Sequence, residues 1–266
     1  MPEGHTVHRI AREFTKRFVG QPVELDSPQG RFAAESALVT GQRMLSAEAH
    51  GKQLFIGFAN QLSIRVHLGI YGKWRFYDVE KFPSESIGAV RVRFFNQKSM
   101  AELRGPTVCE VIDSDAVLAV LNRLGPDPIR EDPKSTEQQR FVDRVSRSKV
   151  AIGQLLMDQS VIAGVGNVYR AELLFRAGIN PHTPGLLLEE EVIRGIWNDS
   201  VKLLRAGVRA GVMVTRDELI GKRPNKSERN FVYKRENSVC RNCSSEIKLQ
   251  MMAGRKLYFC PTCQPT

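Results

Sequence analysis

The sequence SKVAIGQLLMDQSVIAGVGNVYRAELLFRAGINP, residues 148–181, carries two helical patterns in succession. Within each pattern apolar residues recur at the spacing of one face of an α-helix. Gly178 suits the end of the second helix, and Pro181 lies beyond it. The apolar positions are Ile152, Leu155 and Leu156, and then Val168, Ala171, Leu174 and Phe175. We therefore expect two helices here, followed by a longer one over residues 188–201.

Before about residue 120 the pattern has the period of β-strands. In LSIRVHL, residues 62–68, apolar residues alternate with Ser, Arg and His, as in a strand with one buried face. The stretches LFIGF, KWRFY, AVRVRFF and TVCEVI extend this pattern, and Gly- and Asn-containing turns join several of the strands. A helix is expected ahead of them, over residues 6–19. The N-terminal part is thus predicted to be a β-sandwich or barrel with a flanking helix.

A proline-rich segment separates the two patterns. LGPDPIREDPKS, residues 124–135, holds three prolines and is typical of an interdomain linker. The expected layout is an α+β chain with a β-rich domain, a linker, a helical domain and a cysteine-containing module, over residues 1–124, 125–147, 148–228 and 229–266.

Composition excludes several classes of protein. Of the 266 residues, 42% are hydrophobic and 26% are charged, so the chain can bury a core and is not disordered. No apolar run approaches the roughly 18 residues of a membrane span. The start MPEGHTVHRIAREF lacks the apolar stretch of a secretory signal. We expect a soluble, cytoplasmic protein.

The charge is concentrated near the C-terminus. The net charge is +10, and residues 201–266 alone hold 14 Lys and Arg against 5 Asp and Glu. Such a basic region favours a polyanionic partner, nucleic acid first, although a solvated basic face has the same composition.

Four of the five cysteines form two short pairs. Cys240 and Cys243, and then Cys260 and Cys263, are Cys-x-x-Cys pairs separated by sixteen residues. This spacing is typical of a structural zinc ribbon, in which four thiolates surround one Zn²⁺. Disulfides are the alternative, but a chain of this size without an export signal does not need them. Cys109, in TVCEVI, is expected to be an ordinary buried thiol.

The N-terminus offers a nucleophile. Removal of Met1 would expose the secondary amine of Pro2, and α-amino groups are partly neutral near pH 7. A neutral amine attacks a sugar or carbonyl carbon to give an iminium intermediate. Glu3 stands beside it and could move protons or stabilise the cation. An ordinary processed N-terminus has the same sequence, so the pattern alone leaves both interpretations open.

Taken together, MPEG, the following helix and strands, GVGNVYRAELLF and the ribbon ending GRKLYFCPTCQ resemble the formamidopyrimidine-DNA glycosylase / endonuclease VIII family of base-excision repair enzymes. The resemblance covers almost the whole chain. It implies an N-terminal catalytic β-sandwich domain, a C-terminal helix–two-turn–helix DNA-binding domain, and a zinc-finger β-hairpin holding one structural Zn²⁺.

The resemblance also implies catalytic residues. Pro2 would attack C1′ of the damaged nucleotide, and Glu3 would assist sugar-ring opening and proton transfer. Lys52, in AHGKQLF, would contact a phosphate beside the lesion. The alternative is that Lys52 is an ordinary surface lysine on a strand.

Further residues would bind DNA. Asn167 matches the family's DNA-contacting asparagine, and an Asn at that place is also a common helix N-cap. Arg255 resembles the arginine that grips a phosphate, for which its planar fork is suited. Tyr233 resembles another DNA-facing residue, although the glycine that usually follows it is Lys234 here.

An extruded base leaves a gap that a wedge must fill. The segment HLGIYGKW looks like the family's intercalating loop, with Ile70 and Tyr71 as the void fillers; the alternative is two core residues at a strand end.

The opening MPEG and the short HLGIYGKW loop resemble the endonuclease VIII branch, whereas His5-Thr6 departs from the usual proline and acidic residue. We therefore expect a monomeric glycosylase and abasic-site lyase that removes oxidised pyrimidines from damaged double-stranded DNA and nicks it by β,δ-elimination. The alternatives are the same chemistry on oxidised purines, a non-catalytic zinc-ribbon protein that binds damaged DNA, and an RNA-binding zinc protein. The site of action would be the bacterial cytoplasm, at the nucleoid.

Overall fold

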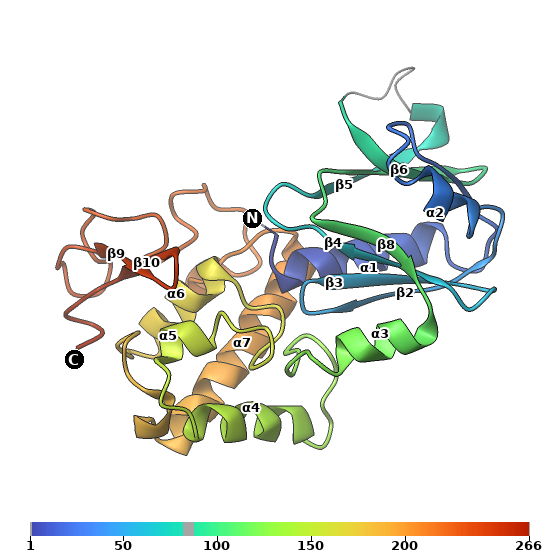
Figure 1. Cartoon of the computed structure of the whole chain (residues 1–266). Helices are drawn as coiled ribbons and strands as arrows, with labels where there is room; N and C mark the ends of the chain where they lie inside the picture. Colours follow the sequence, from blue (N-terminus) through green and yellow to red (C-terminus); the bar gives the residue numbers. More distant parts are fainter. Residues whose placement is uncertain (1, 82–87, 266) are drawn as a thin grey trace. The chain divides into compact units, whose positions relative to one another are not determined.

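The structure is a computed structural model that describes residues 2–81 and 88–265, in two compact units, Met1–Arg123 and Leu124–Thr266 (Figure 1). Among these described residues, no helix is both long and apolar enough to cross a membrane. Each unit has its own buried core.

In the described part of the first unit the strands pair into two antiparallel four-stranded sheets, in the orders β1-β6-β7-β5 and β2-β3-β4-β8. The strands are β1 (Glu24–Asp26), β2 (Met44–His50), β3 (Gln53–Phe58), β4 (Ser63–His67), β5 (Lys73–Asp78), β6 (Val90–Phe95), β7 (Ser99–Arg104) and β8 (Val108–Ile112). The helices are α1 (Gly4–Arg17), α2 (Ala33–Ala37), α3 (Ser114–Leu121) and the short 3-10 helix η1 (Val79–Lys81).

The two sheets and α1 share one core. Ile64 and Val66 of β4 are fully buried, whereas the alternating residues Ser63, Arg65 and His67 are half-buried, as the alternation predicted. Phe14 of α1 packs its ring edge against Trp74 of β5 and Phe94 of β6, at centroid distances of 4.7 and 5.3 Å. This arrangement confirms the predicted β-sandwich with a flanking helix.

The second unit is helical and ends in a hairpin. Its elements are α4 (Thr136–Ser146), α5 (Ile152–Leu155), α6 (Asn167–Arg176), η2 (Gly185–Leu187), α7 (Glu190–Ala210), η3 (Asp217–Leu219), β9 (Lys248–Met252) and β10 (Arg255–Phe259). Every residue of α6 from Asn167 to Phe175 is buried, so α6 is the central helix of this unit. The helical region followed by a β-hairpin with four cysteines agrees with the predicted fold class.

Two local expectations differ from the structure. Residues 136–146, expected to lie in a linker, form α4, because Phe141, Val142 and Val145 on one face of this segment are buried in the core. The helix expected around residues 152–156 is only the single turn α5.

Candidate active site and DNA-binding residues

Pro2 lines a cavity of about 670 Å³ in the first unit. The start of α1 contributes one wall, and the loop between β4 and β5 with the strand after it contributes the other. The lining residues include Pro2, Thr6, Arg9, Ile70, Tyr71 and Trp74. The residue expected to carry the nucleophile therefore adjoins a space large enough for a nucleotide fragment.

Glu3 is held at the N-terminus of α1. It is the N-cap residue in extended conformation, and its carbonyl accepts hydrogen bonds from the backbone N–H groups of Thr6 and Val7, at 2.9 and 3.4 Å. Its side chain is fully buried. The partial positive charge of a helix N-terminus stabilises a carboxylate at this position. A buried carboxylate and the candidate amine are thus covalent neighbours.

His5, where the sequence departs from the usual family pattern, is a buried and neutral imidazole. Burial first, and then the positive charges of the chain's N-terminus, Arg9 and His8, lower the pKa of His5 to about 4. Its Nε2 lies 3.2 Å from Oγ1 of Thr6, which lines the cavity. The sequence marked Thr6 only as a departure from the family pattern and gave it no role, because a threonine in a first helical turn is common.

Lys52 lies in the two-residue turn between β2 and β3. His50 pairs with Gln53 across this turn, and Gly51 takes a φ of +57°, which favours glycine. Because Gln53 also pairs with His67, this turn and the loop after β4 leave the same end of the sheet. Burial first, and then the Lys52 charge, lower the pKa of His67. Lys52 therefore lies close to the start of the loop that carries Ile70.

Ile70 and Tyr71 form the exposed tip of the loop between β4 and β5. Their exposed fractions are 59% and 85%, so they are not core residues at a strand end. The loop is closed by a hydrogen bond of 2.9 Å from the N–H of Gly72 to the carbonyl of Leu68. Two large apolar side chains are thus displayed on a tight loop beside Pro2.

Asn167 does not act as an N-cap. Gly166 occupies that position, and Asn167 is the first residue of α6 with only 7% of its surface exposed. Its Nδ2 donates a hydrogen bond of 2.9 Å to the carbonyl of Lys256 in β10. The capping alternative is therefore wrong, because the side-chain amide binds the hairpin instead.

Arg255 is the first residue of β10 and is exposed. It pairs with Met252 across a tight turn in which Ala253 and Gly254 have φ values of +49° and +71°. The hairpin thereby presents the Arg255 guanidinium to solvent.

Tyr233 is half-buried and packs edge-on against Tyr258 of β10, at a centroid distance of 5.1 Å. Lys234, where the family usually has glycine, adopts a φ of +56°. This left-handed conformation is the one that glycine adopts without strain, so the backbone agrees with the expected correspondence although the side chain differs.

Glu172 is a buried residue that sequence patterns missed. Its carboxylate accepts hydrogen bonds from the backbone N–H groups of Phe231, Val232 and Tyr233, at 2.7 to 2.8 Å, and also from the hydroxyl of Thr215. It thereby holds the segment before the first cysteine. A charged residue in a helical pattern is normally assigned to the solvent face, so only the burial of α6 on every side reveals this role.

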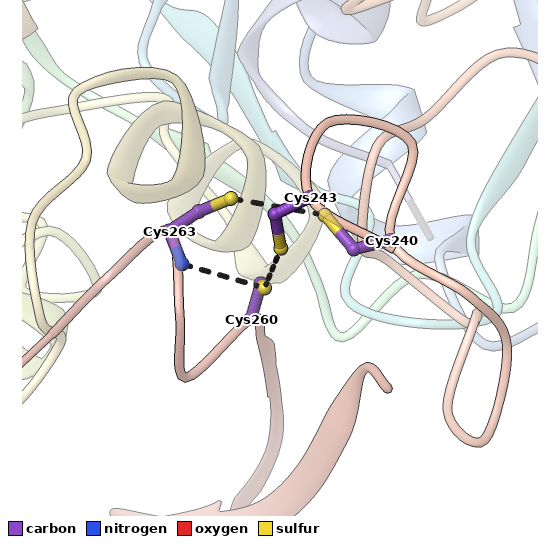
Figure 2. A group of neighbouring side chains, drawn as sticks. All are labelled: Cys240, Cys243, Cys260 and Cys263. Atoms are coloured by element: carbon purple, nitrogen blue, oxygen red, sulfur yellow. Dashed lines mark hydrogen bonds between the residues drawn. The ribbon is translucent and has the colours of Figure 1, made fainter. Parts of the chain in front are cut away.

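The four paired cysteines converge (Figure 2). Their sulfur atoms lie within 4.8 Å of one another. The Sγ–Sγ distances are 3.9 Å for Cys240 and Cys263 and 3.4 Å for Cys243 and Cys260, far longer than a disulfide. Thiolates at about 2.3 Å from a tetrahedral zinc would have similar separations, so the donor set fits one Zn²⁺.

Cys109 belongs to β8 of the first unit, and burial raises the pKa of its thiol to about 12. The expected buried thiol is in fact half-buried. A raised pKa disfavours the reactive thiolate form.

Comparisons with known proteins match both units. Residues 1–105 match the formamidopyrimidine-DNA glycosylase N-terminal domain, and residues 124–218 match the formamidopyrimidine-DNA glycosylase H2TH domain. The chain is 43% identical to Endonuclease 8 1 of Mycobacterium tuberculosis, over 99% of this chain and 100% of that protein. It is 29% identical to the formamidopyrimidine-DNA glycosylase of Heliobacterium modesticaldum, over 99% and 100%.

Solved structures agree. The chain resembles the wild-type Lactococcus lactis Fpg (MutM) in complex with DNA containing N7-benzyl-Fapy-dG, with a TM-score of 0.82, 25% identity and full coverage of both chains.

Proposed function

The chain belongs to the formamidopyrimidine-DNA glycosylase and endonuclease 8 family, and we propose that it removes oxidised pyrimidines from damaged double-stranded DNA. As a member of this family it is a DNA glycosylase and abasic-site lyase of base-excision repair. The pyrimidine preference is supported by the 43% identity to an endonuclease 8, against 27 to 29% for formamidopyrimidine-DNA glycosylases that match along the whole chain.

The observation that carries the mechanism is Pro2 at the cavity with the buried carboxylate of Glu3 beside it. After removal of Met1, the Pro2 amine would form a bond to C1′ while the bond from C1′ to the base breaks. Opening of the sugar ring breaks the C1′–O4′ bond and leaves an iminium ion. Loss of the C2′ proton then expels the 3′-phosphate, and a second elimination at the 5′ side expels the other phosphate.

Glu3 would transfer protons in ring opening, and Lys52 would bind a phosphate next to the lesion. Ile70 and Tyr71 would fill the gap left by the extruded base, for which their exposure on a tight loop is suited. Arg9 at the cavity is a further cation that favours a nucleic-acid substrate.

The second unit would bind the DNA backbone. Arg255, Asn167 and Tyr233 would contribute contacts, and the basic residues of 201–266 would make binding sensitive to salt. One Zn²⁺, held by Cys240, Cys243, Cys260 and Cys263, would stabilise the fold of the hairpin that carries Arg255.

We also propose the functional boundaries expected from the sequence. Residues 1–124 would form the catalytic domain, 148–228 the DNA-binding domain and 229–266 the zinc hairpin, with α4 of residues 136–146 belonging to the helical unit rather than to a linker.

The lesion class is tested with borohydride trapping on duplexes carrying thymine glycol, dihydrouracil, 8-oxoguanine or an abasic site. We expect a covalent adduct with the abasic site and with both pyrimidine lesions, and the least adduct with 8-oxoguanine. A preference for 8-oxoguanine would overturn the pyrimidine assignment and leave the lyase chemistry intact. The absence of an adduct on every duplex would overturn the mechanism.

Glu3→Gln is expected to slow excision of dihydrouracil by about 100-fold or more, because proton transfer of this kind contributes about 10² to 10⁴ in rate. Cleavage of a pre-formed abasic site should fall less, since no base has to leave. Single-turnover rates on the two substrates measure the difference. Glu110→Gln, which removes a carboxylate paired with Arg65 in the same unit, is the control and should leave both rates unchanged. Equal losses on both substrates would contradict this role of Glu3.

A further inference from the structure

Two side chains of α6 bind one backbone carbonyl of the hairpin. The carbonyl of Lys256 accepts a hydrogen bond of 2.9 Å from Nδ2 of Asn167 and another of 3.0 Å from Nη2 of Arg170. The same guanidinium nitrogen donates to Oδ1 of Asn167. The three groups therefore form a closed set of hydrogen bonds between α6 and β10.

Arg170 is fully buried, so in this structure it cannot touch DNA itself. Removing a guanidinium from water is costly unless its hydrogen bonds compensate. Nη2 of Arg170 donates its hydrogen bonds within the second unit, to Asn167 and to the Lys256 carbonyl, and so joins the central helix to the strand that begins at Arg255. We call the hydrogen bonds of Arg170 and Asn167 to the Lys256 carbonyl the tie between α6 and the hairpin.

The hairpin needs such a tie. A two-stranded sheet is marginally stable without packing against other elements. Lys256 directly follows Arg255 in the sequence. The hydrogen-bonded carbonyl of Lys256 therefore anchors the backbone immediately next to the exposed Arg255 side chain. On the opposite strand, Met252 pairs with Arg255 and is itself buried, and a Cβ on Gly153 would approach its sulfur within 2.8 Å. Both strands are thus held at the end that presents Arg255.

We propose that Arg170, together with Asn167, is a positioning residue that fixes the orientation of Arg255 toward a DNA phosphate. This inference rests on the proposed phosphate contact of Arg255. It gives Asn167 a second role beside its proposed contact with the DNA backbone, which is to hold the Lys256 carbonyl of the hairpin.

The test measures binding of a duplex with a stable abasic-site analogue, from low to moderate salt, for Arg170→Met, Arg255→Ala and the double variant. We expect each single variant to weaken binding about tenfold and to reduce the slope of log affinity against log salt by about 0.9, the value for one phosphate contact. The double variant should be no weaker than Arg255→Ala, because both changes remove the same contact. Arg170→Gln keeps an amide donor for the Lys256 carbonyl and should recover part of the affinity.

Arg176→Met is the matched control. Arg176 lies on the same helix and donates to the carbonyl of Thr215, but it binds no group of the hairpin. Any loss of DNA affinity in Arg176→Met should add to the loss in Arg255→Ala. The loss in Arg170→Met should not add, and this contrast separates positioning of Arg255 from general destabilisation of α6.

Amide hydrogen exchange of β9 and β10 in DNA-free protein tests the tie directly. Arg170→Met should accelerate exchange there, and Arg176→Met should not. If Arg255→Ala binds the duplex as tightly as the unaltered chain while Arg170→Met still exchanges faster, the proposed phosphate contact of Arg255 is overturned. The anchoring of the hairpin by Arg170 would then stand without it. Unchanged exchange in Arg170→Met, or additive losses in the double variant, would overturn the positioning role itself.

Discussion

Pro2→Gly is expected to lower the yield of borohydride-trapped protein–DNA adduct by about 100-fold. A secondary amine gives a permanently charged iminium, whereas the iminium of a primary amine can lose its proton. Glycine also frees the backbone that holds the amine beside Glu3, and a displacement of about 1 Å at a reacting atom can cost about 10² in rate. Trapping on a duplex with an abasic site, followed on a denaturing gel, measures the loss.

Pro22→Gly is the matched control for this prediction. Pro22 lies in the same unit, in an isolated bridge with Arg43, and does not line the cavity beside Pro2. Its adduct yield should equal that of the unaltered chain. Mass spectrometry of the adduct should find Pro2 as its first residue. An adduct that retains Met1 would exclude Pro2 as the nucleophile, because a nitrogen in a peptide bond has no lone pair to donate.

Cys260→Ser is expected to abolish stoichiometric zinc binding and to weaken DNA binding by about 1.4 kcal/mol or more, which corresponds to the tenfold loss expected for Arg255→Ala. Cys260 is fully buried, and its sulfur lies 3.4 Å from that of Cys243. Structural zinc contributes an apparent binding free energy of about 10–16 kcal/mol in small zinc-finger peptides, so a missing ligand should leave the hairpin poorly ordered. Metal analysis and fluorescence anisotropy measure the two effects.

Cys109→Ser is the control, because Cys109 lies in β8 of the other unit. It should retain zinc and DNA affinity. At saturating DNA, Cys260→Ser should change the single-turnover rate less than it changes affinity, since Pro2 and Glu3 belong to the first unit. Full zinc content in Cys260→Ser would contradict the ligand assignment.

Features that depend on neighbours in sequence were predictable. The alternation in residues 62–68 became β4, and the helical spacing from Val168 to Phe175 became α6. Each Cys-x-x-Cys pair supplies two sulfurs from one tight turn, so the spacing alone indicated a metal site, and the four sulfurs do converge.

Features that depend on burial were harder to predict. Proline-rich residues 124–135 suggested a linker that extended over residues 136–146, where apolar Phe141 and Val145 instead pack α4 into the core. The sequence did not single out the buried charges Arg170 and Glu172, because a sequence pattern cannot show that a helix is enclosed on all sides.

By itself, the sequence determined the order of the elements, the family and the chemical types at the site: an amine at Pro2, a carboxylate at Glu3 and four thiols. Only the tertiary structure decided what those groups and their neighbours touch. It brought the loop of Ile70 beside Pro2. It also showed that Asn167 does not cap a helix but donates a hydrogen bond to the carbonyl of Lys256, 89 residues away. The physical reason is that helix and strand patterns arise from contacts between residues close in sequence, whereas hydrogen bonds between distant segments exist only once the cores have packed.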